Sequence, residues 1–191
     1  MLDKQAASKI FIDAGALLEG HFKLTSGRHS NQYMQCAQVL KFPRYTEQLA
    51  KDLAEQFSGD KIDLVVGPAM GGIIVAYEVG RQMNLPAIFT ERQDGKMALR
   101  RGFEIKPGQR VLVVEDVVTT GGSVQEVMDI VKENGGEVAG VAVLVDRSGG
   151  QVDFGVKQAA VLSMDIQSWE ADECPLCKEN KIPAIKPGSR S

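Results

Sequence analysis

The sequence predicts an α/β fold in which a parallel sheet carries helices on both faces. Short apolar runs that suit buried strands alternate with longer segments of helical periodicity, in the order β-α-β-α-β-α-β. One run, Val111 to Val114, is apolar throughout, which is typical of a strand buried on both faces. Two acids and a glycine-rich turn follow it, and open α/β sheets bind ligands at that edge. We therefore look for a functional site after residue 114.

The composition is that of an ordinary globular domain. The chain has 191 residues, 43% of them hydrophobic and 25% charged, with a net charge of −3 that gives no basic field for nucleic acid. No apolar run reaches the roughly 18 residues that span a bilayer, and residues 1–5 lack the features of a signal peptide. Three cysteines, an odd number, favour a reducing compartment. We expect one cytoplasmic domain over residues 1–191, with no membrane partner.

The first forty residues predict a helix and a hairpin. Apolar residues recur at helical spacing from Asp3 to Glu19, with Asp3 as a plausible cap and Gly20 as the stop. Alternation from Phe22 to Tyr33 around a central glycine predicts two short strands joined by a tight turn.

The middle of the chain predicts two further helices and two buried strands. In chain order they are a helix over Pro43–Phe57, a strand over Ile62–Gly67, a helix over Ile73–Met83 and a strand over Pro86–Glu91. The turn at residues 67–72 is a second candidate anion loop, because glycines let a ligand approach the backbone.

The segment Arg92–Gly102, which we call the flap, is polar, basic and bounded by glycines. Such a segment is either a solvated surface loop or a mobile flap over a site. The residues alone leave both interpretations open.

Residues 115–123 carry the main candidate site. Glu115 and Asp116 could bind sugar hydroxyls or a metal-bound sugar, since two buried like charges are costly unless something binds them. The turn that follows could offer backbone amides to a phosphate at a helix start. Its residues are Thr119, Thr120, Gly121, Gly122 and Ser123. A sugar phosphate would fit both parts, although such a turn can also serve only to pack a helix.

The remaining core predicts a helix over Ser123–Asn134 and strands over Val138–Val145 and Ala159–Met164. Arg147 follows one of these strands at the edge where ligands bind. It could hold a carboxylate through two hydrogen bonds, or it could pair with Asp146 or another surface acid.

The tail holds a single C-x-x-C pair, Cys174 and Cys177. This pair supplies only two of the four ligands of a structural zinc site, so local packing is favoured over zinc, and zinc over a redox role. We expect residues 182–191 to be extended along the surface.

The apolar strand, two acids and Thr-Thr-Gly-Gly-Ser closely resemble the phosphoribosyl-diphosphate (PRPP) signature of type I phosphoribosyltransferases. Lys23, followed by Ser26-Gly27-Arg28-His29-Ser30 and the aromatic Tyr33, is similar to the N-terminal segment of the orotate branch of that family. The resemblance covers about residues 20–165. It implies a small N-terminal hood at about residues 1–40, a PRPP-binding core at 41–165 and a tail at 166–191.

The resemblance implies transfer of the phosphoribosyl group of PRPP to orotate in pyrimidine biosynthesis, with release of pyrophosphate. Mg²⁺ would be bound through PRPP, with no direct protein ligand. Glu115 and Asp116 would hold the ribose hydroxyls, and residues 119–123 the 5′-phosphate. Arg147, with Thr119, would bind orotate. The rivals are an enzyme for uracil or a purine, and a non-catalytic PRPP-sensing regulator.

The resemblance also assigns the pyrophosphate contacts. Lys23 and the loop residues Ala69 and Met70 would bind it, and the flap would bring Arg92 and Lys96 into the neighbouring subunit's site in a homodimer. On this assignment the catalytic residues are Arg92, Lys96 and Asp116. The chain departs from the family where Met70-Gly71, Gln93 and Ala98 stand at positions that are often Lys, Lys and His, so Arg100 or Arg101 could substitute.

Overall fold

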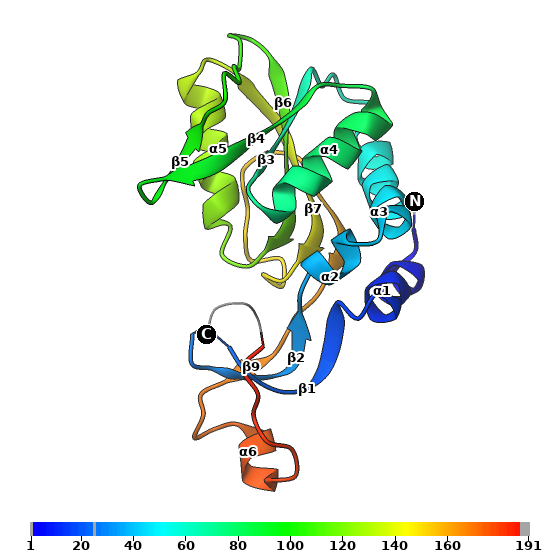
Figure 1. The fold of residues 1–191 in the computed structure, drawn as a ribbon, viewed down its shortest axis with the longest axis vertical. Coiled ribbons are helices and arrows are strands. Elements are labelled where there is room, and N and C mark those ends of the chain that lie inside the picture. The colour runs from blue at the N-terminus through cyan, green and yellow to red at the C-terminus, as the bar shows by residue number, and fades with distance from the viewer. Residues whose placement is uncertain (1, 25, 188–191) are drawn as a thin grey trace.

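The computed structural model describes residues 2–24 and 26–187, and its largest element is a six-stranded sheet (Figure 1). The strand order is β5-β4-β3-β6-β7-β8. β5 runs antiparallel to β4, whereas all other neighbours are parallel. The predicted α/β fold is therefore confirmed, with a mixed sheet in place of a wholly parallel one. The strands are β3 (Leu64–Pro68), β4 (Ala87–Gln93), β5 (Lys96–Leu99), β6 (Arg110–Val118), β7 (Glu137–Asp146) and β8 (Gln158–Ser163).

Helices cover both faces of this main sheet because side chains along a strand point alternately to opposite sides. Leu112 and Val114 of β6 pack in one core, and Val111 and Val113 pack in the other. The first core also takes residues of α1, α2, α3 and α4, and the second takes those of α5. The helices are α1 (Lys4–Asp13), α2 (Ala37–Leu40), α3 (Pro43–Gln56), α4 (Gly71–Met83) and α5 (Gly122–Glu133). No helix in the described part of the chain is long and apolar enough to cross a membrane.

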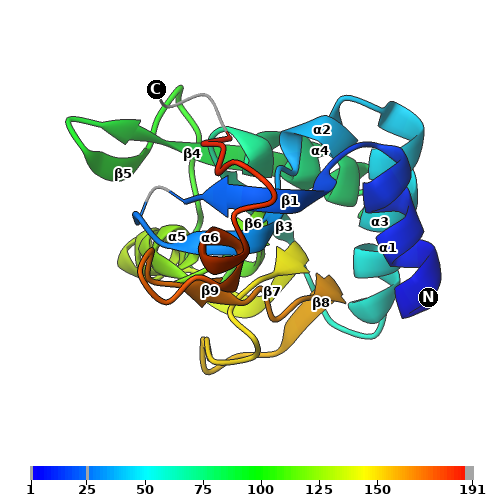
Figure 2. The same cartoon turned by 90° about the horizontal axis from the view of Figure 1, so that it is seen from below.

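A second, three-stranded sheet lies beyond the carboxyl ends of β6 and β7 (Figures 1 and 2). We call it the small sheet; its order is β1-β2-β9, and all its pairs are antiparallel. Its strands are β1 (Leu17–Lys23), β2 (His29–Met34) and β9 (Ser168–Trp169), and the short helix α6 (Pro175–Glu179) lies beside it. The hairpin predicted between residues 22 and 33 is confirmed, and the tail contributes its third strand.

The predicted N-terminal helix is too long. Asp3 caps α1 as expected, because its side chain accepts a hydrogen bond from the Ala6 amide at 2.7 Å. The helix ends at Asp13, and Gly15 takes a φ of +66° that interrupts helical geometry. Leu17 and Leu18, expected on the helix, belong to β1, and Gly20 lies within that strand. Helical spacing alone did not separate the two elements.

Three further expectations on the fold need correction. β6 does not end at the acids but runs through them to Val118, which pairs with Asp146 of β7. The flap is not a plain loop, because residues 90–99 form a β-hairpin. The elements α2, β9 and α6 have no counterpart in the prediction. In the tail, Ile185 pairs with Phe22 as expected of an extended segment, and residues 188–191 lie outside the described part of the chain.

Candidate active site

The acids Glu115 and Asp116, which we call the acid pair, lie on β6 in the middle of the main sheet. Glu115 is only 8% exposed, and its carboxylate accepts a hydrogen bond from the Asp116 amide at 2.9 Å. Burial raises the pKa of Glu115, and the charge of Asp116 raises it further. Burial also raises the pKa of Asp116. Two carboxyl groups held at such a cost are chemically suited to bind hydroxyls or a cation.

The first two residues of α4, which follow directly on the loop from β3, pack on this acid pair. A Cβ built on Gly71 would lie 2.1 Å from Oδ2 of Asp116, and one built on Gly72 would lie 3.1 Å from Oε1 of Glu115. Only glycine allows this approach. The predicted pyrophosphate residues Ala69 and Met70 belong to this loop; the peptide bond between them is cis, and Met70 is 82% exposed.

Gly71 belongs to the turn predicted as a second anion loop, but sequence reasoning missed its close approach to Asp116. The roles of Ala69 and Met70 remain predictions. What the structure adds is their position in the loop that encloses Asp116.

The turn at residues 119–123 connects β6 to α5 as predicted. Gly121 has a φ of +80°, and a Cβ there would lie 2.8 Å from Val152 and 3.0 Å from Phe154. Both the backbone conformation and the packing therefore require glycine at this position. Gly121 stands at the N-cap of α5 and has no side chain with which to cap it. The first amides of the helix can therefore bind an anion at the end of the strand that carries the acid pair.

Arg147 lies at the same edge of the sheet, after β7. Its backbone amide donates to the Val118 carbonyl at 2.8 Å. Within the described residues it forms no ion pair, and its Nε is buried without a hydrogen-bond partner. Asp146 instead accepts from the Ser148 amide at 2.8 Å, which argues against the surface-pair alternative. Burial lowers the pKa of Arg147, and a half-buried guanidinium with a free Nε donor suits a planar anion.

The small sheet approaches this site through the segment that follows β2. The Cys36 thiol donates to the carbonyl of Asp116 at 3.5 Å. Cys36 and Tyr33 also lie within electrostatic range of Arg147. Lys23, predicted to bind pyrophosphate, is the last residue of β1 in the same sheet.

The flap residues lie elsewhere in this single chain. Arg92 pairs with Glu126 of α5 at 2.9 Å, and among the described contacts neither Arg92 nor Lys96 reaches the acid pair. Arg100 and Arg101, the possible substitutes, both pair with Glu91. The flap hairpin projects from the edge of the main sheet (Figure 1). Two acids outside residues 92–102, Glu91 and Glu126, therefore offset part of the positive charge of the flap.

The comparisons with known proteins agree with this geometry. Residues 38–175 match the model of the phosphoribosyl transferase domain. The orotate phosphoribosyltransferase of Pelotomaculum thermopropionicum is 60% identical over 95% of both chains. That of Heliobacterium modesticaldum is 63% identical over 95% of this chain and 96% of its own.

Solved structures give the same result at lower identity. The orotate phosphoribosyltransferase of Mycobacterium tuberculosis in complex with inorganic phosphate matches with a TM-score of 0.67 at 27% identity, covering 82% of this chain and 94% of that one. The enzyme of Aeropyrum pernix gives a TM-score of 0.66 at 28% identity, with 82% and 93% covered. With this fold, this acid pair and full-length relatives at 60% identity or more, the chain belongs to the orotate phosphoribosyltransferases, within the phosphoribosyl transferase domain family.

Proposed function

We propose that this protein transfers the 5-phosphoribosyl group of PRPP to orotate, giving orotidine 5′-monophosphate and pyrophosphate in the synthesis of UMP. The observation that carries this proposal is the similarity to orotate phosphoribosyltransferases over 95% of the chain. Arg147 supports it, because its Nε is buried without a hydrogen-bond partner at the same edge of the sheet and orotate differs from uracil by a carboxylate.

In this proposal, different residues of the site bind different parts of PRPP. The acid pair would hold the ribose hydroxyls, and the amides at residues 119–123 would hold the 5′-phosphate. Arg147, with Thr119 at the start of that turn, would bind orotate over the anomeric carbon. Ala69 and Met70 would contribute backbone contacts to the pyrophosphate from the loop around Asp116.

Mg²⁺ fits the chemistry of this site. The buried Glu115 and the half-buried Asp116, both with raised pKa values, provide oxygen donors that gain from a nearby cation. In our proposal the ion is bound through PRPP rather than by direct protein ligands, and it would neutralise the leaving pyrophosphate.

Catalysis in this proposal rests on positioning and electrostatics, since no protein nucleophile is needed. As the bond to pyrophosphate breaks, positive charge develops on the ribose and negative charge on the leaving group. The carboxylates of the acid pair lie on the ribose side. Lys23, Arg92 and Lys96 would supply positive charge on the pyrophosphate side. Closure of the flap would exclude the water that otherwise hydrolyses PRPP.

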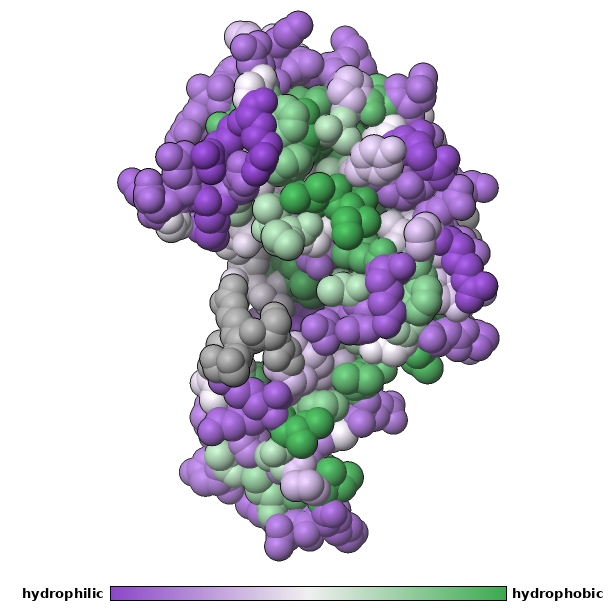
Figure 3. Space-filling model, in the orientation of Figure 1, coloured by the Kyte–Doolittle hydropathy of each residue, from purple (hydrophilic) through white to green (hydrophobic). Residues whose placement is uncertain are grey.

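Arg92 and Lys96 can take this role if a second subunit presents them. An apolar surface over α4 supports a homodimer: Met70, Ile74 and Tyr77 are 82%, 45% and 69% exposed and follow one another at helical spacing. Figure 3 shows apolar side chains gathered on this face. A patch of this kind on a single chain marks an interface. We further place the enzyme in a reducing cytoplasm, because its three cysteines are free thiols.

The test is PRPP-dependent consumption of four bases by the purified chain. We expect orotate to exceed uracil, hypoxanthine and adenine in kcat/KM by at least tenfold, about 1.4 kcal/mol of discrimination. Preference for another base would assign a different acceptor, and PRPP binding without turnover of any base would indicate a regulator. In the active enzyme, Asp116→Asn should lower kcat by at least tenfold with the fold intact; unchanged kinetics would remove the acid pair from the site.

A further inference from the structure

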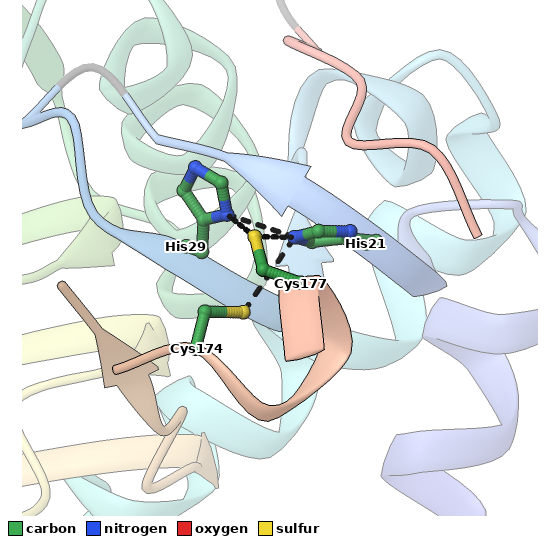
Figure 4. A group of neighbouring side chains, drawn as sticks. All are labelled: His21, His29, Cys174 and Cys177. Atoms are coloured by element: carbon green, nitrogen blue, oxygen red, sulfur yellow. Dashed lines mark hydrogen bonds between the residues drawn. The ribbon is translucent and has the colours of Figure 1, made fainter. Parts of the chain in front are cut away.

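Four metal-ligand side chains meet on the side of the small sheet next to α6, outside the acid pair, the signature turn and Arg147. They are His21 of β1, His29 of β2, and Cys174 and Cys177 at the start of α6 (Figure 4). We call them the Cys/His cluster. One ligand atom from each lies within 4.8 Å of all the others. His21, His29 and Cys174 are buried, and Cys177 closes the cluster on the solvent side.

We propose that the Cys/His cluster is a structural zinc site. The distances from nitrogen to sulfur are 3.6 Å for Cys174 to His21, 3.6 Å for Cys177 to His21 and 3.2 Å for Cys177 to His29. A tetrahedral Zn²⁺ with its usual bond lengths places such atoms about 3.5 Å apart. The two ring nitrogens are 2.8 Å apart and need to separate by about half an ångström to admit the ion.

The hydrogen bonds around His21 prepare it as a ligand. Its Nδ1 lies 2.9 Å from the carbonyl oxygen of Ile182. A carbonyl oxygen only accepts, so Nδ1 is the donor of this hydrogen bond and Nε2 is the ring nitrogen that faces the cluster. Structural and catalytic metal sites use such a carbonyl to fix the tautomer and the ring orientation of a ligating histidine.

The donor set selects the metal. Two thiolates and two imidazoles in a closed tetrahedral arrangement are typical of structural zinc. The C-x-x-C pair alone supplies half of that set, and the fold brings the other half from a hairpin some 150 positions earlier in the chain, as the pair separations of 148 to 156 residues show.

The cluster also explains how α6 is held in place. This helix has five residues, none of them buried, so apolar packing does not fix it. Next to the cluster, the Ile185 amide donates to the His21 carbonyl, and the Lys23 amide donates to the Ile185 carbonyl. A bound Zn²⁺ would join the hairpin and the tail at one point, two residues from Lys23. The free energy of metal binding would then stabilise the small sheet.

The experiment measures metal rather than catalysis. The wild-type chain, the double variant Cys174→Ser/Cys177→Ser and the control Cys36→Ser are stripped with a chelator under reducing conditions, supplied with Zn²⁺ and desalted. We expect about one zinc per chain in the wild type and in Cys36→Ser, and less than a tenth of that in the double variant. Cys36 is the matched control because it is the third cysteine, is buried and lies outside the cluster.

Three further measurements decide the outcome if the double variant does not fold. Co²⁺ added to the stripped wild type should give the thiolate charge-transfer absorption of a tetrahedral sulfur site, and His21→Ala should bind Zn²⁺ at least tenfold more weakly. Zn²⁺ should also raise the midpoint of thermal unfolding of the wild type. The proposal is overturned if the wild type retains no more zinc than the double variant, if Co²⁺ gives no thiolate band, or if a Cys174–Cys177 disulfide persists under reducing conditions with Zn²⁺ present.

Discussion

Gly71→Ala tests whether the close approach of the start of α4 to the acid pair matters in the working enzyme. The added methyl would lie 2.1 Å from Oδ2 and 2.5 Å from Cγ of Asp116, whereas an ordinary contact begins at 3.4 Å. Either the loop or the carboxylate must therefore move by more than an ångström. Gly71 is the first residue of α4 and its φ is not positive, so alanine is otherwise compatible with the backbone.

A displacement of about 1 Å at a reacting centre can cost as much as 10²-fold in rate. We expect kcat/KM for PRPP to fall by about ten- to a hundredfold, which is roughly 1.4 to 2.7 kcal/mol. Overpacking costs about 1 to 3 kcal/mol of stability, and the gain in helix propensity over glycine offsets about 1 kcal/mol of it, so the variant should stay folded. The measurements are orotate consumption at varied PRPP and the thermal unfolding midpoint.

Gly59→Ala is the matched control, because a Cβ at Gly59 would meet no atom within 4 Å and its φ is not positive. It should keep wild-type kinetics. If a folded Gly71→Ala enzyme also stays within twofold of the wild-type kcat/KM, the loop does not hold Asp116 in the active state, and the close approach described above has no functional role.

Three other predictions follow from the same site. Arg147→Ala should reduce the preference for orotate over uracil at least tenfold, since a charged hydrogen bond is worth about 1.5–3 kcal/mol. The control Arg110→Ala, at the opposite end of β6, should leave that ratio unchanged. Equal orotate-to-uracil ratios in the two variants would show that Arg147 does not bind orotate. The raised pKa of Glu115 means that the folded state holds its proton to a higher pH than the unfolded state, so the free energy of unfolding should fall as the pH rises from about 5 to 8. Glu115→Gln should flatten that decline in thermal melts without PRPP, and an unaltered slope would show that Glu115 ionises normally. Lys96→Ala mixed with Asp116→Asn should recover activity if hybrid dimers form with one intact shared site; hybrids seen by mass spectrometry without recovered activity would place the flap in its own subunit.

The sequence was most informative where one local pattern decides the structure. The buried run at Val111–Val114 predicted the central strand, and the helices α3, α4 and α5 begin and end within about two residues of their expected bounds. Patterns of this kind depend on which faces of a helix or strand are buried, and the positions of the apolar residues in the sequence indicate those faces directly.

Long-range pairing produced the errors and the omissions. Leu17 and Leu18 fit a helical period, yet the β1–β2 pairing places them in a strand. β9 has two residues and exists only because β2 offers it an edge. The same limit applies to the sites: the C-x-x-C pair was visible, but nothing local connects it to His21 and His29. Likewise, no spacing in the sequence shows that Gly71 touches Asp116.

The connection of the small sheet to both ends of the described chain bears on the order in which the protein folds during synthesis. β1 and β2 leave the ribosome first, but their partners β9 and Ile185 are among the last described residues to emerge. All strands of the main sheet lie between them in the sequence. The β1–β2 hairpin therefore lacks these partners until the strands of the main sheet have been synthesised. A ribosome halted after β8 would carry all strands of the main sheet, with the acid pair and Arg147, and an unfinished small sheet, so the position of Lys23 at the end of β1 would be fixed last.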